Sequence, residues 1–195
     1  MKNYLFKLGV QAKKVSNKTI KSKKKDQVLK DYCNLLFKNQ LKIISENKKE
    51  FKKAKEKKLK ENLINRLKID HKKILQIINS TKTIIKFKDP VGQILERWKR
   101  PNGLNIKKIT IPIGVVAVIY ESRPNVTSDV ASLCFKSGNP VIMKGGSEAY
   151  YSNKIFTNLF RKALKKNKIN KNYVQFIDYK NRKVVDFLLT RMTNY

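Results

Sequence analysis

The sequence predicts an α/β protein in which a parallel sheet with connecting helices follows a helical region and a β-hairpin. Three observations support this fold class. From residue 112 onward, short apolar runs alternate with helix-sized stretches, an order typical of right-handed βαβ units. Residues 1–88 carry apolar side chains at helical spacing among many lysines. The pair Asn102-Gly103 lies between two strand-like runs, which is a strong hairpin signal.

Residues 1–88 are expected to be a helical part of the same domain as the sheet. Val28 to Phe37 repeats its apolar positions about every 3.6 residues. Glu46 to Leu67 carries only a thin apolar stripe, and Ile74 to Ile85 places isoleucines on one side. Because thin stripes cannot form a core of their own, we expect these helices to pack on another layer. Pro90 disfavours helix at Asp89, so the boundary is expected there.

Residues 89–111 are expected to form a β-hairpin arm. Gln93 to Lys99 and Leu104 to Ile111 alternate loosely between apolar and polar residues. Nucleotide binding does not require a hairpin at this point in the chain. We therefore interpret it as an arm that pairs with another part of the molecule or with another subunit.

Residues 112–195 are predicted to form a βαβαβα unit, half of a nucleotide-binding domain. The first strand, Ile113 to Tyr120, is a continuous apolar run and is expected to be buried on both faces. The elements expected after it are a helix at Thr127 to Lys136, a strand at Val141 to Met143, a helix from Ser147 to about Lys166, a strand at Tyr173 to Ile177 and a helix at Arg182 to Arg191.

The loops after the first two strands carry the candidate site. In an open parallel sheet, ligands bind beyond the carboxyl ends of the strands. The loops concerned begin at Tyr120 and Met143 and contain Asn125 and Lys144. We therefore expect Asn125 and Lys144 to border one crevice. The chemistry allows Lys144 to bind a phosphate or a ribose hydroxyl, and Asn125 to donate to a developing oxyanion.

The residues that follow Lys144 fit the same interpretation. Gly145 and Gly146 allow a ligand to approach the backbone closely. Glu148, in the first helical turn, is able to accept from a ribose hydroxyl. Each residue also has a structural interpretation: a solvated charge for Lys144, an ordinary turn for the two glycines, a charge that complements the helix dipole for Glu148 and a helix cap for Asn125.

The net charge of +32 comes from 46 basic and 14 acidic residues, and taken alone it suggests a nucleic acid or an anionic membrane surface. However, 39 of the basic residues are Lys and only 7 are Arg, while Asn (19) and Ile (20) are also abundant. All three abundant residues have A/T-rich codons, so drift in base composition accounts for the excess. No apolar stretch approaches the roughly 18 residues of a membrane span. A basic nucleic-acid-binding module remains the alternative function.

Six short motifs occur in order along the second half of the chain. They are Asp89-Pro-Val-Gly, Pro101-Asn-Gly-Leu, Pro112-Ile-Gly-Val, Ile119-Tyr-Glu-Ser-Arg-Pro-Asn-Val-Thr, Leu133-Cys-Phe-Lys-Ser-Gly-Asn and Gly145-Gly-Ser-Glu-Ala. Together they resemble the gamma-glutamyl phosphate reductase family, also called glutamate-5-semialdehyde dehydrogenase, a branch of the aldehyde dehydrogenase superfamily. Weaker similarity extends back through Asn65-Arg-Leu and forward to Val174-Gln-Phe-Ile-Asp.

The resemblance implies a Rossmann-like sheet that is part of an aldehyde dehydrogenase cofactor domain. It also implies NADPH-dependent reduction of L-glutamyl 5-phosphate to L-glutamate 5-semialdehyde and phosphate, in proline biosynthesis. In that reaction a cysteine thiolate displaces phosphate, and NADPH reduces the resulting thioacyl group. The expected setting is a cytoplasmic homo-oligomer with no metal.

Site roles follow from the same resemblance. Asn125 matches the residue that stabilises the oxyanion. Arg123 is a candidate for the substrate's phosphate or carboxylate, from its charge alone. The residues expected to bind the cofactor are Lys144, Gly145, Gly146, Ser147 and Glu148.

The family's nucleophilic cysteine lies in a second half that has no counterpart in this chain. Cys134 and Cys33 lie on apolar helix stripes and are expected to be packed thiols. His71 is near an expected helix start and is not expected to act as ligand or base. We therefore expect the chain to match the amino-terminal portion of the enzyme and to be inactive alone. A separate chain carrying the catalytic half is a further possibility.

Overall fold

The computed structural model describes residues 1–181 and 183–191. In chain order, the helices before the arm are α1 (Lys2–Ser16), α2 (Ser22–Lys38), α3 (Gln40–Glu56), α4 (Glu61–Leu67) and α5 (His71–Lys86). The arm consists of β1 (Ile94–Lys99) and β2 (Asn105–Ile109). The elements after it are β3 (Val116–Ile119), α6 (Pro124–Lys136), β4 (Val141–Lys144), η1 (Ser147–Ala149), α7 (Tyr150–Lys166), η2 (Lys171–Tyr173), β5 (Val174–Phe176) and α8 (Lys183–Arg191).

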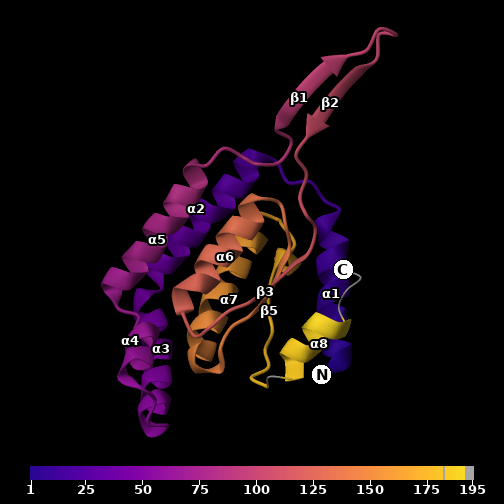
Figure 1. Ribbon diagram of the computed structural model, residues 1–195. Coiled ribbons are helices and arrows are strands. Elements are labelled where there is room, and N and C mark those ends of the chain that lie inside the picture. The colour runs from indigo at the N-terminus through magenta and orange to yellow at the C-terminus, as the bar shows by residue number, and fades with distance from the viewer. Residues whose placement is uncertain (182, 192–195) are drawn as a thin grey trace.

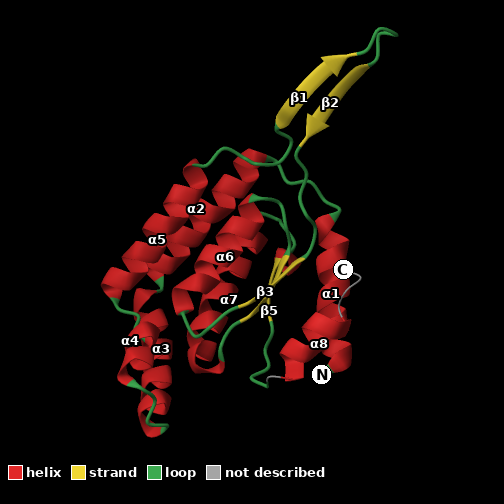
Figure 2. Cartoon of the chain, in the orientation of Figure 1, coloured by secondary structure: helices red, strands yellow, loops and turns green. Residues whose placement is uncertain are grey.

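Three parallel strands form the sheet, in the order β3-β4-β5 (Figure 2). The central strand β4 is buried along its whole length, whereas β3 lies at one edge and alternates in exposure. The expectation that residues Ile113 to Tyr120 form a strand buried on both faces is therefore wrong. The strand covers only four of these residues, and the Ile113 side chain is 89% exposed.

Helices cover both faces of the sheet (Figure 1). Because side chains alternate along a strand, Val141 and Met143 of β4 face one layer and Ile142 faces the other. The larger core contains apolar residues of α2, α5, α6 and α7, with aromatic contacts between Phe160 and both Tyr32 and Phe135. The smaller core joins Ile142 to apolar residues of α1 and α8. The expectation that the N-terminal helices pack on another layer is confirmed.

The stretch from Glu46 to Leu67, whose single apolar stripe suggests one helix, belongs to two helices. Helix α3 ends at Glu56, and Lys58 takes a left-handed backbone conformation with φ of 51° before α4 begins. The chain returns through Leu59, which packs with Phe51 around a small cluster that includes Leu67. A thin stripe could not reveal this break, because its apolar positions continue through the turn.

Two helix starts also differ from the prediction. Helix α6 begins at Pro124, three residues earlier than expected, because proline fits the first helical turn. Residues Ser147–Ala149 form a 3-10 turn, so α7 begins at Tyr150 rather than at Ser147. Helix α8 is described from Lys183, and the predicted start at Arg182 lies outside the described residues.

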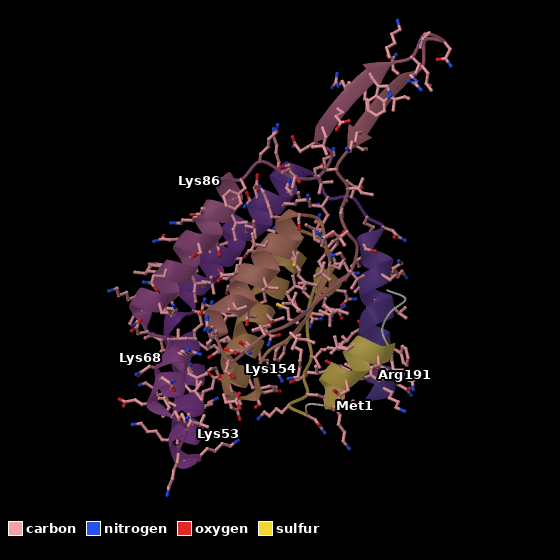
Figure 3. All side chains as sticks on the ribbon, viewed as in Figure 1. Met1, Lys53, Lys68, Lys86, Lys154 and Arg191 are labelled. Carbon is pink, nitrogen blue, oxygen red and sulfur yellow. The ribbon has the colours of Figure 1, made fainter. Side chains whose placement is uncertain are left out.

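The predicted hairpin is confirmed and projects from the body of the molecule (Figure 1). Strands β1 and β2 pair antiparallel, with Trp98 opposite Ile106, and Figure 3 shows their side chains extending into solvent. The base of the hairpin is held by an ion pair of 2.9 Å between Lys25 of α2 and Asp89. Among the described helices, none is long and apolar enough to cross a membrane.

Candidate functional site

A cavity of about 610 Å³ lies at the carboxyl ends of β3 and β4. The loop after β3 contributes Tyr120 to Arg123, and the end of β4 with its loop contributes Lys144 to Glu148. The other wall comes from distant parts of the chain, among them Leu59, Leu63, Arg66, Leu67 and Lys180. The cavity therefore occupies the place where parallel sheets bind ligands.

Lys144 ends β4 and has an almost fully buried side chain, with 6% of its surface exposed. Its Nζ donates one hydrogen bond, of 2.8 Å, to the carbonyl oxygen of Gly145. No carboxylate of the described residues lies within ion-pair distance of it. Burial lowers the pKa of Lys144, and the charge of Glu148 opposes that effect. The ammonium group keeps two donors for a ligand.

Glu148 is held by a serine at each carboxylate oxygen. Its Oε2 accepts from Ser122 at 2.5 Å and its Oε1 from Ser147 at 2.7 Å. Burial on its own would raise the pKa of Glu148, but these hydrogen bonds outweigh burial and lower it. The carboxylate therefore stays ionised and joins the loops that follow β3 and β4.

The two glycines are required by the packing of the protein itself. A Cβ added to Gly145 would lie 2.2 Å from Nδ2 of Asn153, and one added to Gly146 would lie 2.1 Å from Oγ of Ser122. The predicted approach of a ligand to this backbone concerns a different direction from the added Cβ and stays a prediction.

Asn125 does not lie beside Lys144, so the expectation that they border one crevice is wrong. Its side chain lines a neighbouring hollow of about 600 Å³, and its Nδ2 donates to Oδ2 of Asp129 at 3.4 Å. The reason is the early start of α6, which places Asn125 inside the first helical turn rather than in the loop. The side chain therefore lies one helical turn from Asp129 and is not part of the lining of the cavity at β3 and β4.

Arg123 and Arg66 line both hollows and stand between them. Each lies near the carboxylate of Glu121, at 4.0 and 3.8 Å respectively. Sequence reasoning included Arg123 but gave no role to Arg66, Ser122 or Lys180. Only the weak similarity at Asn65-Arg-Leu pointed toward Arg66.

Neither cysteine is placed to act as a nucleophile in the cavity. Cys33 and Cys134 are free thiols, and burial raises the pKa of each to about 11. Neither lines the cavity at β3 and β4.

The exposed His71 forms a hydrogen bond of 2.8 Å between its Nδ1 and Oε1 of Gln40. The described residues contain no group of three side chains suited to hold a metal ion.

Comparison with known proteins shows that this chain is similar in sequence to part of one enzyme. The chain is 46% identical over 162 residues to gamma-glutamyl phosphate reductase of Nautilia profundicola, covering 83% of this chain and 39% of that protein. It is 41% identical over 195 residues to the enzyme of the same name from Nitratiruptor sp., covering 100% of this chain and 47% of that protein. The chain thus spans less than half the length of the curated relatives it matches. No family model matches it.

Solved structures agree with the sequence comparison. Gamma-glutamyl phosphate reductase of Thermotoga maritima superposes with a TM-score of 0.91 at 34% identity, over 93% of this chain and 44% of that one. The Saccharomyces cerevisiae enzyme gives 0.84 at 28% identity, over 90% and 46%. A probable aldehyde dehydrogenase from Listeria monocytogenes, at 13% identity and a TM-score of 0.71 over 97% and 39%, shares the fold. The predicted fold class and the resemblance are confirmed.

Proposed function

We propose that this chain, similar over nearly all of its length to part of gamma-glutamyl phosphate reductase, supplies the NADPH-binding half of an enzyme of proline biosynthesis. The reaction is the reduction of L-glutamyl 5-phosphate to L-glutamate 5-semialdehyde and phosphate. The observation that carries the proposal is the cavity at the ends of β3 and β4, where Lys144 and Glu148 present a cation and an anion.

The side chains of the cavity fit a dinucleotide. Lys144 has two unused donors for a phosphate or a ribose hydroxyl, and no carboxylate of the described residues neutralises it. Glu148 is ionised and is able to accept from a ribose hydroxyl, with Ser147 beside it. Gly145 and Gly146 allow the loop that carries these groups to pack closely against Asn153 and Ser122. When bound, NADPH supplies the hydride, and the residues named here bind and orient it.

The balance of charge in the cavity favours NADPH over NADH. Its lining includes four basic side chains and two acidic ones: Arg66, Arg123, Lys144 and Lys180 against Glu121 and Glu148. The 2′-phosphate distinguishes NADPH from NADH and adds negative charge to the ligand. An excess of cations therefore stabilises the phosphorylated cofactor more.

The thiol that attacks the acyl phosphate comes from outside residues 1–195 in this proposal. Cys33 is buried and Cys134 half-buried, both thiols have a raised pKa that leaves little thiolate, and neither lines the cavity. The source is a further segment of the same protein or a separate chain. Arg123, on the rim, is proposed to bind the substrate's phosphate or carboxylate, while the oxyanion role of Asn125 stays a prediction.

The arrangement in the cell is part of the same proposal. We assign residues 1–88 and 112–195 to one cofactor-binding domain and residues 89–111 to an arm that joins subunits. A cytoplasmic location fits a biosynthetic enzyme. The alternative of a nucleic-acid-binding module has no support, because the relatives named above are enzymes by name.

Titration of the purified chain with NADPH, followed by nicotinamide fluorescence, tests the proposal. Lys144→Met should weaken binding about tenfold or more, because a hydrogen bond to a charged group contributes roughly 1.5–3 kcal/mol. Lys107→Met, on the exposed arm, is the matched control and should bind as the wild type does. Failure of the wild-type chain to bind NADPH, or equal loss in both variants, contradicts the proposal. Reduction of glutamyl phosphate by residues 1–195 alone contradicts the assignment of the thiol.

A further inference from the structure

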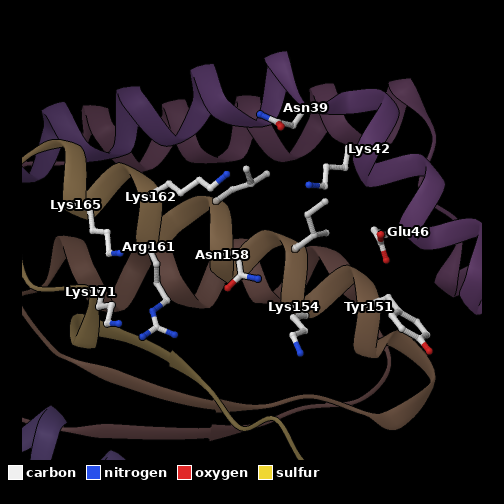
Figure 4. A pocket seen from close by; sticks show the side chains of 12 residues that line it. Asn39, Lys42, Glu46, Tyr151, Lys154, Asn158, Arg161, Lys162, Lys165 and Lys171 are labelled. Carbon is white, nitrogen blue, oxygen red and sulfur yellow. The ribbon is translucent and has the colours of Figure 1, made fainter.

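A second hollow, of about 550 Å³, lies on the outer side of α7 (Figure 4). Its walls are α7, the junction of α2 with α3, and η2. Six basic side chains line it: Lys42, Lys154, Arg161, Lys162, Lys165 and Lys171. The acidic side chain in its lining is Glu46. The hollow shares no lining residue with the cavity at β3 and β4.

The acids near this hollow neutralise one of its six cations, Lys154. Glu46 already pairs with Lys49 at 2.8 Å. Asp178, the acid nearest to Lys154, pairs with that lysine at 2.8 Å. The charges of Arg161 and of the remaining lysines therefore stay unbalanced within the described structure.

Arg161 is the informative member of the group. Its side chain is partly buried, yet it has no carboxylate partner and no hydrogen-bond acceptor among the described residues. Burial lowers the pKa of Arg161, in keeping with its partly buried position. In Figure 4 it extends from α7 beside Lys171. Arg66 and Arg123, by contrast, share Glu121.

The buried lysines of the chain show how the fold compensates a cation that is shielded from water. Lys25 pairs with Asp89, and Lys136 pairs with Asp26 at 2.5 Å. Lys144 has no such partner, and it lines the cavity proposed to bind a cofactor. Because a buried charge without a partner is costly, an unpaired cation in a hollow indicates an external anion.

We propose that this hollow binds a small anion with two or more phosphate groups, with Arg161, Lys165 and Lys171 as its main contacts. The guanidinium group can hold two oxygens of one phosphate, and the lysines supply point charges to the next. The volume lies within the usual range of small-ligand sites. The inference does not depend on the proposed function.

A small anion fits better than a nucleic acid. Single-stranded nucleic acids need a basic groove that carries several aromatic side chains for stacking. Here one aromatic residue, Tyr151, lines the hollow, and its hydroxyl accepts from Lys53 at 2.6 Å. The cations also gather around one hollow rather than along a track.

Calorimetric titration with sodium tripolyphosphate at fixed ionic strength tests the proposal. The full chain should bind, and Arg161→Gln should weaken binding about tenfold or more, since it removes charge-assisted hydrogen bonds. Lys171→Gln, at an exposed position, should weaken binding in the same direction and guards against misfolding of the first variant. Lys107→Gln on the arm should change the affinity less than about twofold. Lys144→Met, which removes a cation from the other cavity, should cost less affinity than Arg161→Gln does.

Three results would overturn the proposal. The first is no binding of tripolyphosphate by the wild-type chain. The second is a loss in Lys107→Gln or Lys144→Met equal to that in Arg161→Gln, which indicates nonspecific attraction or binding in the other cavity. The third is tighter binding of an oligonucleotide than of tripolyphosphate, with the same dependence on Arg161, which assigns the surface to nucleic acid.

Discussion

Ser122, in the loop after β3, donates a hydrogen bond of 2.5 Å to Oε2 of Glu148, in the loop after β4. Both residues line the candidate cofactor cavity, and the contact joins the segments that follow two parallel strands. It also contributes to lowering the pKa of Glu148. The shape of the cavity and the charge state of its acid therefore depend on the same hydrogen bond.

Ser122→Ala should reduce stability at neutral pH by about 1 kcal/mol, the contribution of one hydrogen bond. Glu148 has a lowered pKa in the folded state, so its contribution is present above its ordinary pKa. That contribution is lost as the pH falls through the lowered value. Urea unfolding from pH 7 to pH 3 should show the deficit of the variant shrinking toward acid. Ser80→Ala, at an exposed position, should show no such trend.

Gly146→Ala should destabilise the protein by about 1–3 kcal/mol, the usual cost of overpacking. The added Cβ would lie 2.1 Å from Oγ and 2.9 Å from the backbone nitrogen of Ser122. Adding Ser122→Ala removes the first contact, so the double variant should lose less stability than the sum of the single changes. Thermal unfolding of the four proteins measures this coupling. Strict additivity would show that the loops do not contact as described.

Lys25→Met should destabilise the protein by about 3 kcal/mol, because it leaves Asp89 without its partner at the base of the arm. Lys25 is 1% exposed, so water cannot replace the ion pair. The matched control is Lys23→Met, an exposed position on the same helix, which should change stability by less than about 0.5 kcal/mol. Equal effects in denaturant unfolding would contradict the importance of the pair.

The same ion pair predicts a pH dependence. Burial would raise the pKa of Asp89, but hydrogen bonds from Lys25 and the Val91 amide outweigh it and lower that pKa. The stability from the pair is therefore present above the ordinary pKa of Asp and is lost as the pH falls through the lowered value. Lowering the pH should reduce the free energy of unfolding less in Lys25→Met than in the wild-type chain. Unfolding curves at pH 7 and pH 3 compare the two losses.

Glu50→Gln should flatten the pH dependence of stability above the ordinary pKa of Glu. Burial raises the pKa of Glu50 despite hydrogen bonds from Ser152 and Asn47. Its contribution is therefore complete below the ordinary pKa of Glu and is lost as the pH rises through the raised value. Exposed Glu56 lies on the same helix, and Glu56→Gln should keep the wild-type profile. An unchanged profile in Glu50→Gln would exclude this carboxyl as the titrating group.

Local patterns in the sequence were enough for the order of the elements from the arm onward. The Asn102-Gly103 turn, the strand at Val141 and the loop from Lys144 to Glu148 all follow from neighbouring residues. Such patterns depend on backbone preferences over a few positions, which is why they survive in a lysine-rich chain. The motifs around them were specific enough to indicate the related enzyme.

Only the tertiary structure decided which side chains meet. Arg66 reaches the cavity from α4, before the arm, and Lys180 from the segment after β5, and no periodicity records that approach. The direction of Asn125 changed because α6 begins three residues early, a shift too small for an amphipathic pattern to resolve. The unpaired charge of Arg161 likewise became visible only once every neighbouring acid was placed. Contacts between distant segments depend on how the helices pack, and packing is a property of the whole fold.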